Sequence, residues 1–131
     1  MAYIIDADWI IEIARGNSVA SQVVNALAPE VVAVSWMTLG EIYEVAFNTP
    51  HPEAYMGNLQ QLLDGFVAIG VDRPIIERFA EVRALLRRQG QLISDLDIIV
   101  AATALARDLT VLTYNRRHFE RVPDLRIYQA G

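Results

Sequence analysis

Residues 93–113 constrain the fold more than any other part of the chain. This segment opens with Asp95 and Asp97, runs almost without a polar side chain to Ala106, and ends in the β-branched stretch 110–113. A surface helix normally keeps a polar face, so a helix with almost none belongs in the interior of a domain. Its two acids then stand at the helix N-terminus, where free backbone N–H groups favour negative charge.

Short apolar runs alternate with helical patterns along the rest of the chain. We expect strands at residues 2–5, 31–34, 66–71, 110–113 and an edge strand at 125–128. Helices are expected at about 8–16, from 17 or 18 until Pro29, and at 39–47, 53–63 and 74–90, before the apolar helix. A turn and a short helical piece should occupy 113–119. The alternation predicts one α/β domain over residues 1–131, a three-layer α/β/α sandwich around a mostly parallel sheet of four to five strands.

Composition excludes several kinds of chemistry. The chain has no cysteine, and all eleven basic residues are arginine, so thiolate sites, Schiff-base lysines and a phosphate-loop lysine are absent. Residues 1–72 carry nine acids and one arginine, whereas residues 73–131 carry ten arginines and seven acids. The second half could hold a phosphodiester, although ion pairs on solvated helices explain the same charges. No stretch is long enough to span a membrane, and we expect a soluble, cytoplasmic protein.

Acidic residues recur where the predicted strands end. Asp6 follows the first strand, Glu41 lies early in the helix after the second strand, and Asp95 and Asp97 open the apolar helix. Each has an alternative role as a helix cap, because Asp6 can cap the next helix and both Thr38–Glu41 and Ser94–Asp97 resemble capping boxes. In parallel sheets, however, ligands bind outside the carboxyl ends of the strands. The acids could therefore meet at one site.

Like charges brought together need compensation. If three carboxylates met within about 4 Å, each pair would cost ~4 kcal/mol at an effective dielectric constant of about 20. Three such pairs rival the ~5–15 kcal/mol stability of a whole domain. The cluster must then take up protons or a cation, and Mg²⁺ or Mn²⁺ suits oxygen ligands. Such an ion can activate water for attack on phosphorus.

Four sequence blocks resemble those of the PIN-domain ribonucleases, and among them the VapC-like toxins. The blocks are YIIDAD at 3–8, SWMTLGEIYE at 35–44, DIIVAATALA at 97–106 and LTVLTYNRRHFERVPDLRI at 109–127. The resemblance covers essentially the full chain. It implies a PIN-like fold and an Mg²⁺- or Mn²⁺-dependent endoribonuclease, which leaves a 5′-phosphate and a 3′-hydroxyl.

The same resemblance assigns roles to individual residues. It implies that Asp6, Glu41 and Asp97 bind the metal, and that Asn115 occupies a fourth polar position in the catalytic site. Because Asn115 carries no negative charge, a second strongly held metal is in doubt. Four further positions have weaker roles: Asp95 and Thr113 are auxiliary, and Arg116 and Arg117 are candidate RNA contacts that could equally form an exposed turn.

The resemblance also implies a substrate and protein partners, and two other functions remain open. The resemblance implies structured RNA such as tRNA or rRNA as substrate, a VapB-like antitoxin as inhibitor, and a homodimer. One alternative is a degenerate PIN-like domain that only binds or regulates. Another is a phosphatase of the haloacid-dehalogenase type, with Asp6 as nucleophile and Asp8 as acid, although the lysine which that chemistry needs is missing. We expect Trp9 and Trp36 in the core and His118 on the surface.

Overall fold

The computed structural model describes residues 2–27 and 30–129. Its sheet has five strands in the order β3-β2-β1-β4-β5, and every neighbouring pair is parallel. The strands are β1 (Ala2–Ile5), β2 (Val32–Ser35), β3 (Val67–Ile69), β4 (Leu109–Leu112) and β5 (Arg126–Ile127). The parallel α/β fold is as the sequence predicts. The two edge strands β3 and β5 are shorter than expected, because each has only one neighbour to pair with.

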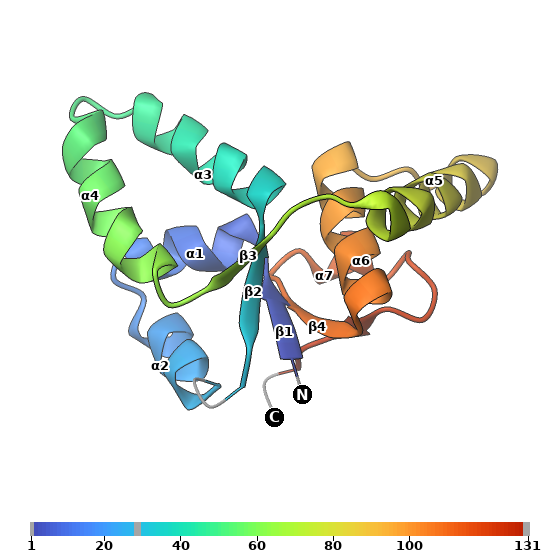
Figure 1. The fold of residues 1–131 in the computed structure, drawn as a ribbon, viewed down its shortest axis with the longest axis horizontal. Coiled ribbons are helices and arrows are strands. Elements are labelled where there is room, and N and C mark those ends of the chain that lie inside the picture. The colour runs from blue at the N-terminus through green and yellow to red at the C-terminus, as the bar shows by residue number, and fades with distance from the viewer. Residues whose placement is uncertain (1, 28–29, 130–131) are drawn as a thin grey trace.

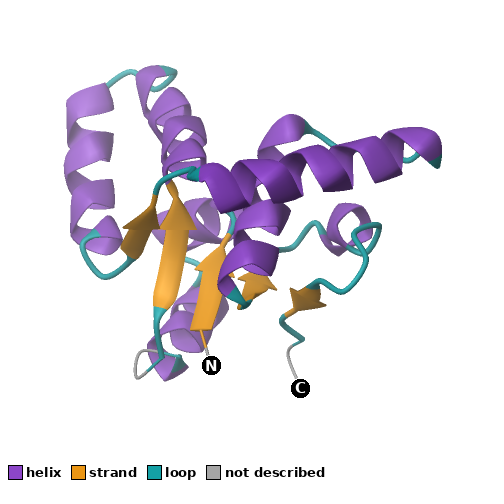
Figure 2. Ribbon diagram, turned by 45° about the vertical axis from the view of Figure 1, so that its right-hand side comes forward, coloured by secondary structure: helices purple, strands orange, loops and turns teal. Residues whose placement is uncertain are grey.

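Helices cover both faces of this sheet. They are α1 (Ala7–Ala14), α2 (Ser18–Ala26), α3 (Trp36–Phe47), α4 (Pro52–Leu63), α5 (Arg73–Arg88), α6 (Asp95–Arg107) and α7 (Arg116–Phe119). Figure 1 shows α1 to α4 on one side of the strands and α5 to α7 on the other. Figure 2 shows the arrows of β1, β2 and β3 pointing to the same edge. The three-layer sandwich is therefore confirmed.

Polar side chains cap most of the helices. Ser94 Oγ accepts from the Asp97 backbone N–H at 3.2 Å and begins α6 where the sequence places it. The predicted capping box at Thr38 is wrong, because Ser35 caps α3 instead by accepting from the Met37 N–H at 3.2 Å. Strand β2 thus passes directly into α3, and the helix begins three residues earlier than expected. Pro29, predicted to end the second helix, lies outside the described residues.

The sheet divides the interior into two hydrophobic cores. Ile4 packs with residues of α5, α6 and α7, whereas its neighbour Ile5 packs with residues of α1 to α4. The alternation follows from the strand geometry, since successive side chains point to opposite faces. In α6 every residue from Ile98 to Ala104 is buried, as its lack of a polar face predicts. The N-terminus of α6 is consequently held firmly against the sheet.

The topology brings the carboxyl ends of β1 and β4 side by side, and we call this part of the sheet edge the crevice. Strands β1 and β4 are neighbours, with Ile5 paired to Leu112, yet α1 follows β1 on one face and α7 follows β4 on the other. Ligand sites in open α/β sheets lie at such a divergence of connections. Residues just after β1 and β4 are therefore the first candidates for a functional site. Every helix in the described part of the chain falls short of the length and apolarity that crossing a membrane requires.

Candidate active site

Asp6 lies directly after β1, in the crevice beside β4. Its backbone N–H donates to the Leu112 carbonyl at 2.9 Å, so the strand pairing fixes its position. Its carboxylate accepts from the Ala7 N–H at 2.9 Å and from the Thr113 hydroxyl at 2.8 Å. Only 6% of the residue is exposed. Burial, reinforced by the nearby charge of Asp8, raises the pKa of Asp6 to about 7.

Asp8 is a second acid of the crevice. From the sequence, a catalytic role for Asp8 was expected only in the phosphatase alternative. Its Oδ2 accepts from the Tyr114 backbone N–H at 3.1 Å and lies 3.3 Å from the Thr113 hydroxyl oxygen. Its other oxygen, Oδ1, is buried and has no hydrogen-bond partner among the described residues. Burial raises the pKa of Asp8, and the charge of Asp97 acts in the same direction. The signal in the sequence was the Asp-x-Asp spacing across the junction of β1 and α1.

Asp97 enters the crevice from the first turn of α6. Its Oδ2 lies 3.2 Å from His118 Nδ1, and the same nitrogen lies 2.7 Å from Asn115 Nδ2. A ring nitrogen carries either a proton or a lone pair, so Nδ1 can satisfy one of these contacts as donor or the other as acceptor. Asn115 is further held by its backbone N–H, which donates to Thr113 Oγ1 at 2.9 Å. These contacts join α6, α7 and the end of β4 at the site.

His118, expected on the surface, is partly exposed and also contacts two of the predicted site residues. Its side chain is 39% exposed, but it contacts Asp97 and Asn115. The reason is Phe119, which is fully buried in the core beneath α6 and α7. Anchoring Phe119 turns the short helix α7 so that its preceding residue faces α6. The arginines that precede His118 in the sequence gave no indication that Phe119 would be buried.

Glu41 lies on the second turn of α3, on the same side of the sheet as Asp8 of α1 and on the opposite side from Asp97 of α6 (Figure 1). Burial raises its pKa, and the charges of Asp97 and Asp8 raise it further. The charge of Asp97 raises the pKa values of Asp6, Asp8 and Glu41, and the charge of Asp8 raises those of Asp6 and Glu41, which indicates that the four acids lie in one region. Three of the four predicted site residues are in this cluster, and the fourth, Asn115, borders it through His118.

The acids do not form a compact ligand set. Over residues 2–27 and 30–129, no three acidic or histidine side chains are placed to hold a metal ion together. Arg116, next to Asn115 in the chain, is engaged elsewhere: its Nη1 donates to the Tyr128 carbonyl at 2.8 Å, and its Nη2 lies 3.7 Å from Glu120 Oε1.

Other predicted site residues lie elsewhere. Asp95 is 63% exposed and pairs with Arg83 of α5 at 2.8 Å, so it connects two helices. Arg117 is exposed on α7, whereas Arg116 is half-buried. Trp9 is buried as expected, but Trp36 is 56% exposed, which contradicts its predicted core position. Trp36 begins α3 at the carboxyl edge of the sheet, beyond the end of the packed helical layer.

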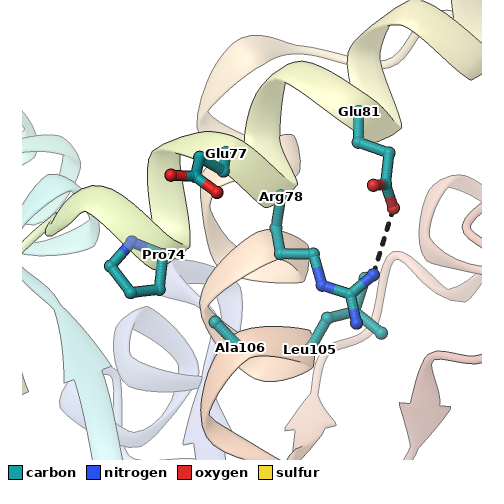
Figure 3. A pocket seen from close by; sticks show the side chains of 6 residues that line it. All are labelled: Pro74, Glu77, Arg78, Glu81, Leu105 and Ala106. Atoms are coloured by element: carbon teal, nitrogen blue, oxygen red, sulfur yellow. Dashed lines mark hydrogen bonds and ion pairs between the residues drawn. The ribbon is translucent and has the colours of Figure 1, made fainter.

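A separate hollow of about 390 Å³ lies between α5 and α6, remote from the acids. Figure 3 shows Arg78 and Glu81 of α5 paired across it, beside Leu105 of α6. Their atoms are 3.1 Å apart, and Glu77 pairs with Arg73 at 3.2 Å. With these charges satisfied within one helix, the hollow offers no reactive group, and the acid cluster is the better candidate site.

Comparison with known proteins identifies the family. A model described as the PIN domain matches residues 3–125. Ribonuclease VapC2 of Haemophilus influenzae is 32% identical over 95 residues, which are 72% of this chain and 72% of that protein. The tRNA(fMet)-specific endonuclease VapC of Shigella flexneri is 30% identical over 95 residues, with the same coverage of 72% of each chain.

Solved structures agree in fold. VapBC2 from Rickettsia felis, bound to a DNA fragment from its promoter, matches with a TM-score of 0.94 at 21% identity over 100% of both chains. DNA-bound VapBC from Salmonella typhimurium matches with a TM-score of 0.91 at 24% identity over 98% of this chain and 97% of that one. Since the family model covers nearly all of the sequence, this chain belongs to the PIN-domain family.

Proposed function

We propose that this PIN-domain protein is a divalent-metal-dependent endoribonuclease and the toxin of a toxin–antitoxin pair. The supporting observation is the set of four acids at the carboxyl edge of the sheet, in a chain 32% identical to a ribonuclease VapC2. The phosphatase alternative is dropped, because the chain belongs to the PIN-domain family and contains no lysine.

The residues of the crevice fit a hard divalent cation such as Mg²⁺ or Mn²⁺. Asp6, Glu41 and Asp97 would hold it after their side chains, which the described structure does not gather into a ligand set, turn toward one another around the ion. Two observations favour a cation here: burial raises the pKa values of Asp6, Asp8 and Glu41, and Asp8 Oδ1 is buried with no hydrogen-bond partner among the described residues. When bound, the ion supplies an ionised water for attack on the phosphodiester and stabilises the leaving oxygen.

The surrounding side chains keep the acids in place. The Thr113 hydroxyl and the Ala7 N–H fix the Asp6 carboxylate, and they favour its charged form. With a proton on Nδ1, His118 donates to Asp97 Oδ2 and limits the rotation of that carboxylate. Because Asp6 holds its proton up to about pH 7 without a cation, binding of the ion would release a proton near neutral pH. Arg117 and Arg116 remain candidates for contact with RNA phosphates.

Substrate and partners are proposed from the relatives. The Shigella relative is named for action on tRNA(fMet), and we propose structured RNA such as tRNA or rRNA here. The Rickettsia and Salmonella structures are of VapBC assemblies bound to DNA, and we propose a VapB-like antitoxin as inhibitor. We further propose that residues 1–131 act as one domain, that the enzyme is a homodimer, and that it works in the cytoplasm, where such RNA is found.

The test is Mn²⁺-stimulated cleavage of total cellular RNA by the purified protein. We expect cleavage at few positions, with 5′-phosphate ends, and its loss in Asp97→Asn at an unchanged circular dichroism spectrum. Full activity in Asp97→Asn, purified free of contaminating nuclease, would overturn the proposal.

A non-catalytic PIN-like binding module is the remaining alternative, and the uncharged Asn115 favours it. Calorimetric titration with Mn²⁺ distinguishes the two functions. A folded protein that fails to bind Mn²⁺ would support the binding module.

A further inference from the structure

We propose that the hollow beside Asp8 is a subsite for one unpaired nucleobase of the RNA, with the Tyr114 ring as its stacking platform. The inference rests on the proposed ribonuclease function and adds to it a residue that selects and positions the substrate. The hollow has a volume of about 540 Å³, and it is lined by Asp8, Ile11, Glu12, Arg15, Asn17 and Tyr114. Asp8 thus borders both the hollow and the acid crevice.

The hollow adjoins the crevice, so a nucleotide of an RNA bound at the crevice can reach it. Asp8 Oδ2 accepts the Tyr114 backbone N–H at 3.1 Å, and the adjacent Thr113 contacts Asp6 at 2.8 Å. A phosphodiester lying at the acids would therefore have a flanking nucleotide within reach of the Tyr114 ring. The link is made by backbone and short side chains, so the distance between platform and crevice is fixed.

The Tyr114 ring is held rigidly and still has an open face. It stacks on Trp9 with centroids 4.8 Å apart and planes inclined by 10°. Trp9 is itself buried and also makes an edge contact with Tyr128 at 6.3 Å. Tyr114 nevertheless remains 50% exposed. An exposed aromatic ring backed by a buried one is suited to stacking a base, because little freedom is lost on binding.

The walls of the hollow favour a base over the sugar–phosphate backbone. Glu12 is an acid that would repel a phosphate, whereas its carboxylate can accept hydrogen bonds from the N–H groups of a base edge. Arg15 and Asn17 both contact Glu12, at 3.7 Å and 3.4 Å, which orients that carboxylate. Ile11 adds an apolar side to the hollow. Aromatic stacking with a polar edge is the mode in which proteins bind single-stranded RNA.

The experiment measures binding and stacking of a single-stranded RNA, independently of cleavage. Ten-nucleotide RNAs of mixed sequence, each with one 2-aminopurine at a different position, are titrated onto Asp97→Asn protein with Mg²⁺. We expect the fluorescence to be quenched at one position, where the base stacks. Adding Tyr114→Leu, which retains apolar cover for Trp9, should abolish that quenching and weaken binding between about fivefold and a hundredfold.

Two matched variants serve as controls. Tyr114→Phe keeps the ring and should retain both quenching and affinity. Phe47→Ala removes another exposed aromatic side chain, at the far end of α3, and should change neither. Urea midpoints and near-ultraviolet circular dichroism establish that the Tyr114→Leu protein is folded.

The outcomes separate failure of the subsite from failure of the proposed function. Suppose that the protein with Asp97 intact cleaves RNA. Equal RNA affinity of Asp97→Asn with and without Tyr114→Leu would then overturn the subsite alone. A Tyr114→Leu protein that binds RNA normally but no longer binds its antitoxin would assign the hollow to a protein partner and overturn the proposal. If the chain neither binds nor cleaves RNA, the proposed function fails and the subsite fails with it.

Discussion

Replacing Asp6 by asparagine should stabilise the metal-free protein at and above neutral pH. The carboxyl group is 6% exposed, and its pKa in the folded protein is about 7 against an ordinary value of 3.8. The folded state thus keeps the proton over a pH range in which the unfolded chain has lost it. Asparagine has the same shape as the protonated acid and carries no charge at any pH.

The sign and size of the effect follow from proton linkage. Because the pKa of Asp6 is raised in the folded state, its contribution to the free energy of unfolding is fully present below pH 3.8. That contribution is lost as the pH rises through about 7. At about 1.4 kcal/mol per pH unit, the difference corresponds to up to ~4 kcal/mol of unfolding free energy. Asparagine can keep the local contacts, because its oxygen can accept from the Ala7 N–H while its NH₂ group donates to Thr113 Oγ1. The Thr113 hydroxyl is then free to donate to Asp8.

Urea unfolding in EDTA, monitored by circular dichroism at pH 4.5 and pH 8, measures the effect. The advantage of Asp6→Asn over the parent protein should be small at pH 4.5 and should increase by about 3 to 4 kcal/mol at pH 8. Asp64→Asn, which changes an exposed acid at the end of α4, serves as the control and should show no such increase. A parallel pH dependence of Asp6→Asn and its parent would refute the reasoning.

Three further predictions concern the metal, the ion pair and the core. Saturating Mn²⁺, at about 100 times its dissociation constant, should raise the unfolding free energy of the parent protein at pH 8 by ~3 kcal/mol. Calorimetry should show no binding of Mn²⁺ to Asp97→Asn. Equal stabilisation of both proteins would count against Asp97 as a ligand. Asp95→Asn should retain RNA cleavage and lose at most ~1 kcal/mol in urea, because its ion pair with Arg83 is exposed; loss of activity would return Asp95 to the site. Ile98→Ala should cost ~2–5 kcal/mol, since Ile98 is fully buried in α6, and a cost below 1 kcal/mol would show that α6 is not packed as described.

Periodicity was sufficient to predict the fold. The apolar helix 95–107 and the short strands fix the parallel sheet, since only burial on both faces explains such runs. The start of α3 was predicted too late, because Ser35 both ends β2 and caps the helix. Trp36 was expected in the core, but it lies at the first position of α3 and is 56% exposed. Spacing cannot tell where a neighbouring element stops.

The acid cluster was predictable only in part. Asp6, Glu41 and Asp97 stand out because each follows or precedes a buried strand, and the topology makes them neighbours. The contacts of His118 were missed because its position depends on the next residue, Phe119, which is buried among residues that are distant in the sequence. The spacing of the carboxylates was also beyond the sequence, since it depends on the balance between repulsion and the contacts of Thr113. Local patterns carry no information on that balance.

The pairing of Thr113 with Asp6 joins residues 107 positions apart in the chain. Strand β1 is synthesised well before its partner β4, because more than a hundred positions separate them along the chain. Until that late strand docks, the N-terminal strand has an empty edge and the acids have no common pocket. A chain cut short before β4 is therefore unable to bring these acids together.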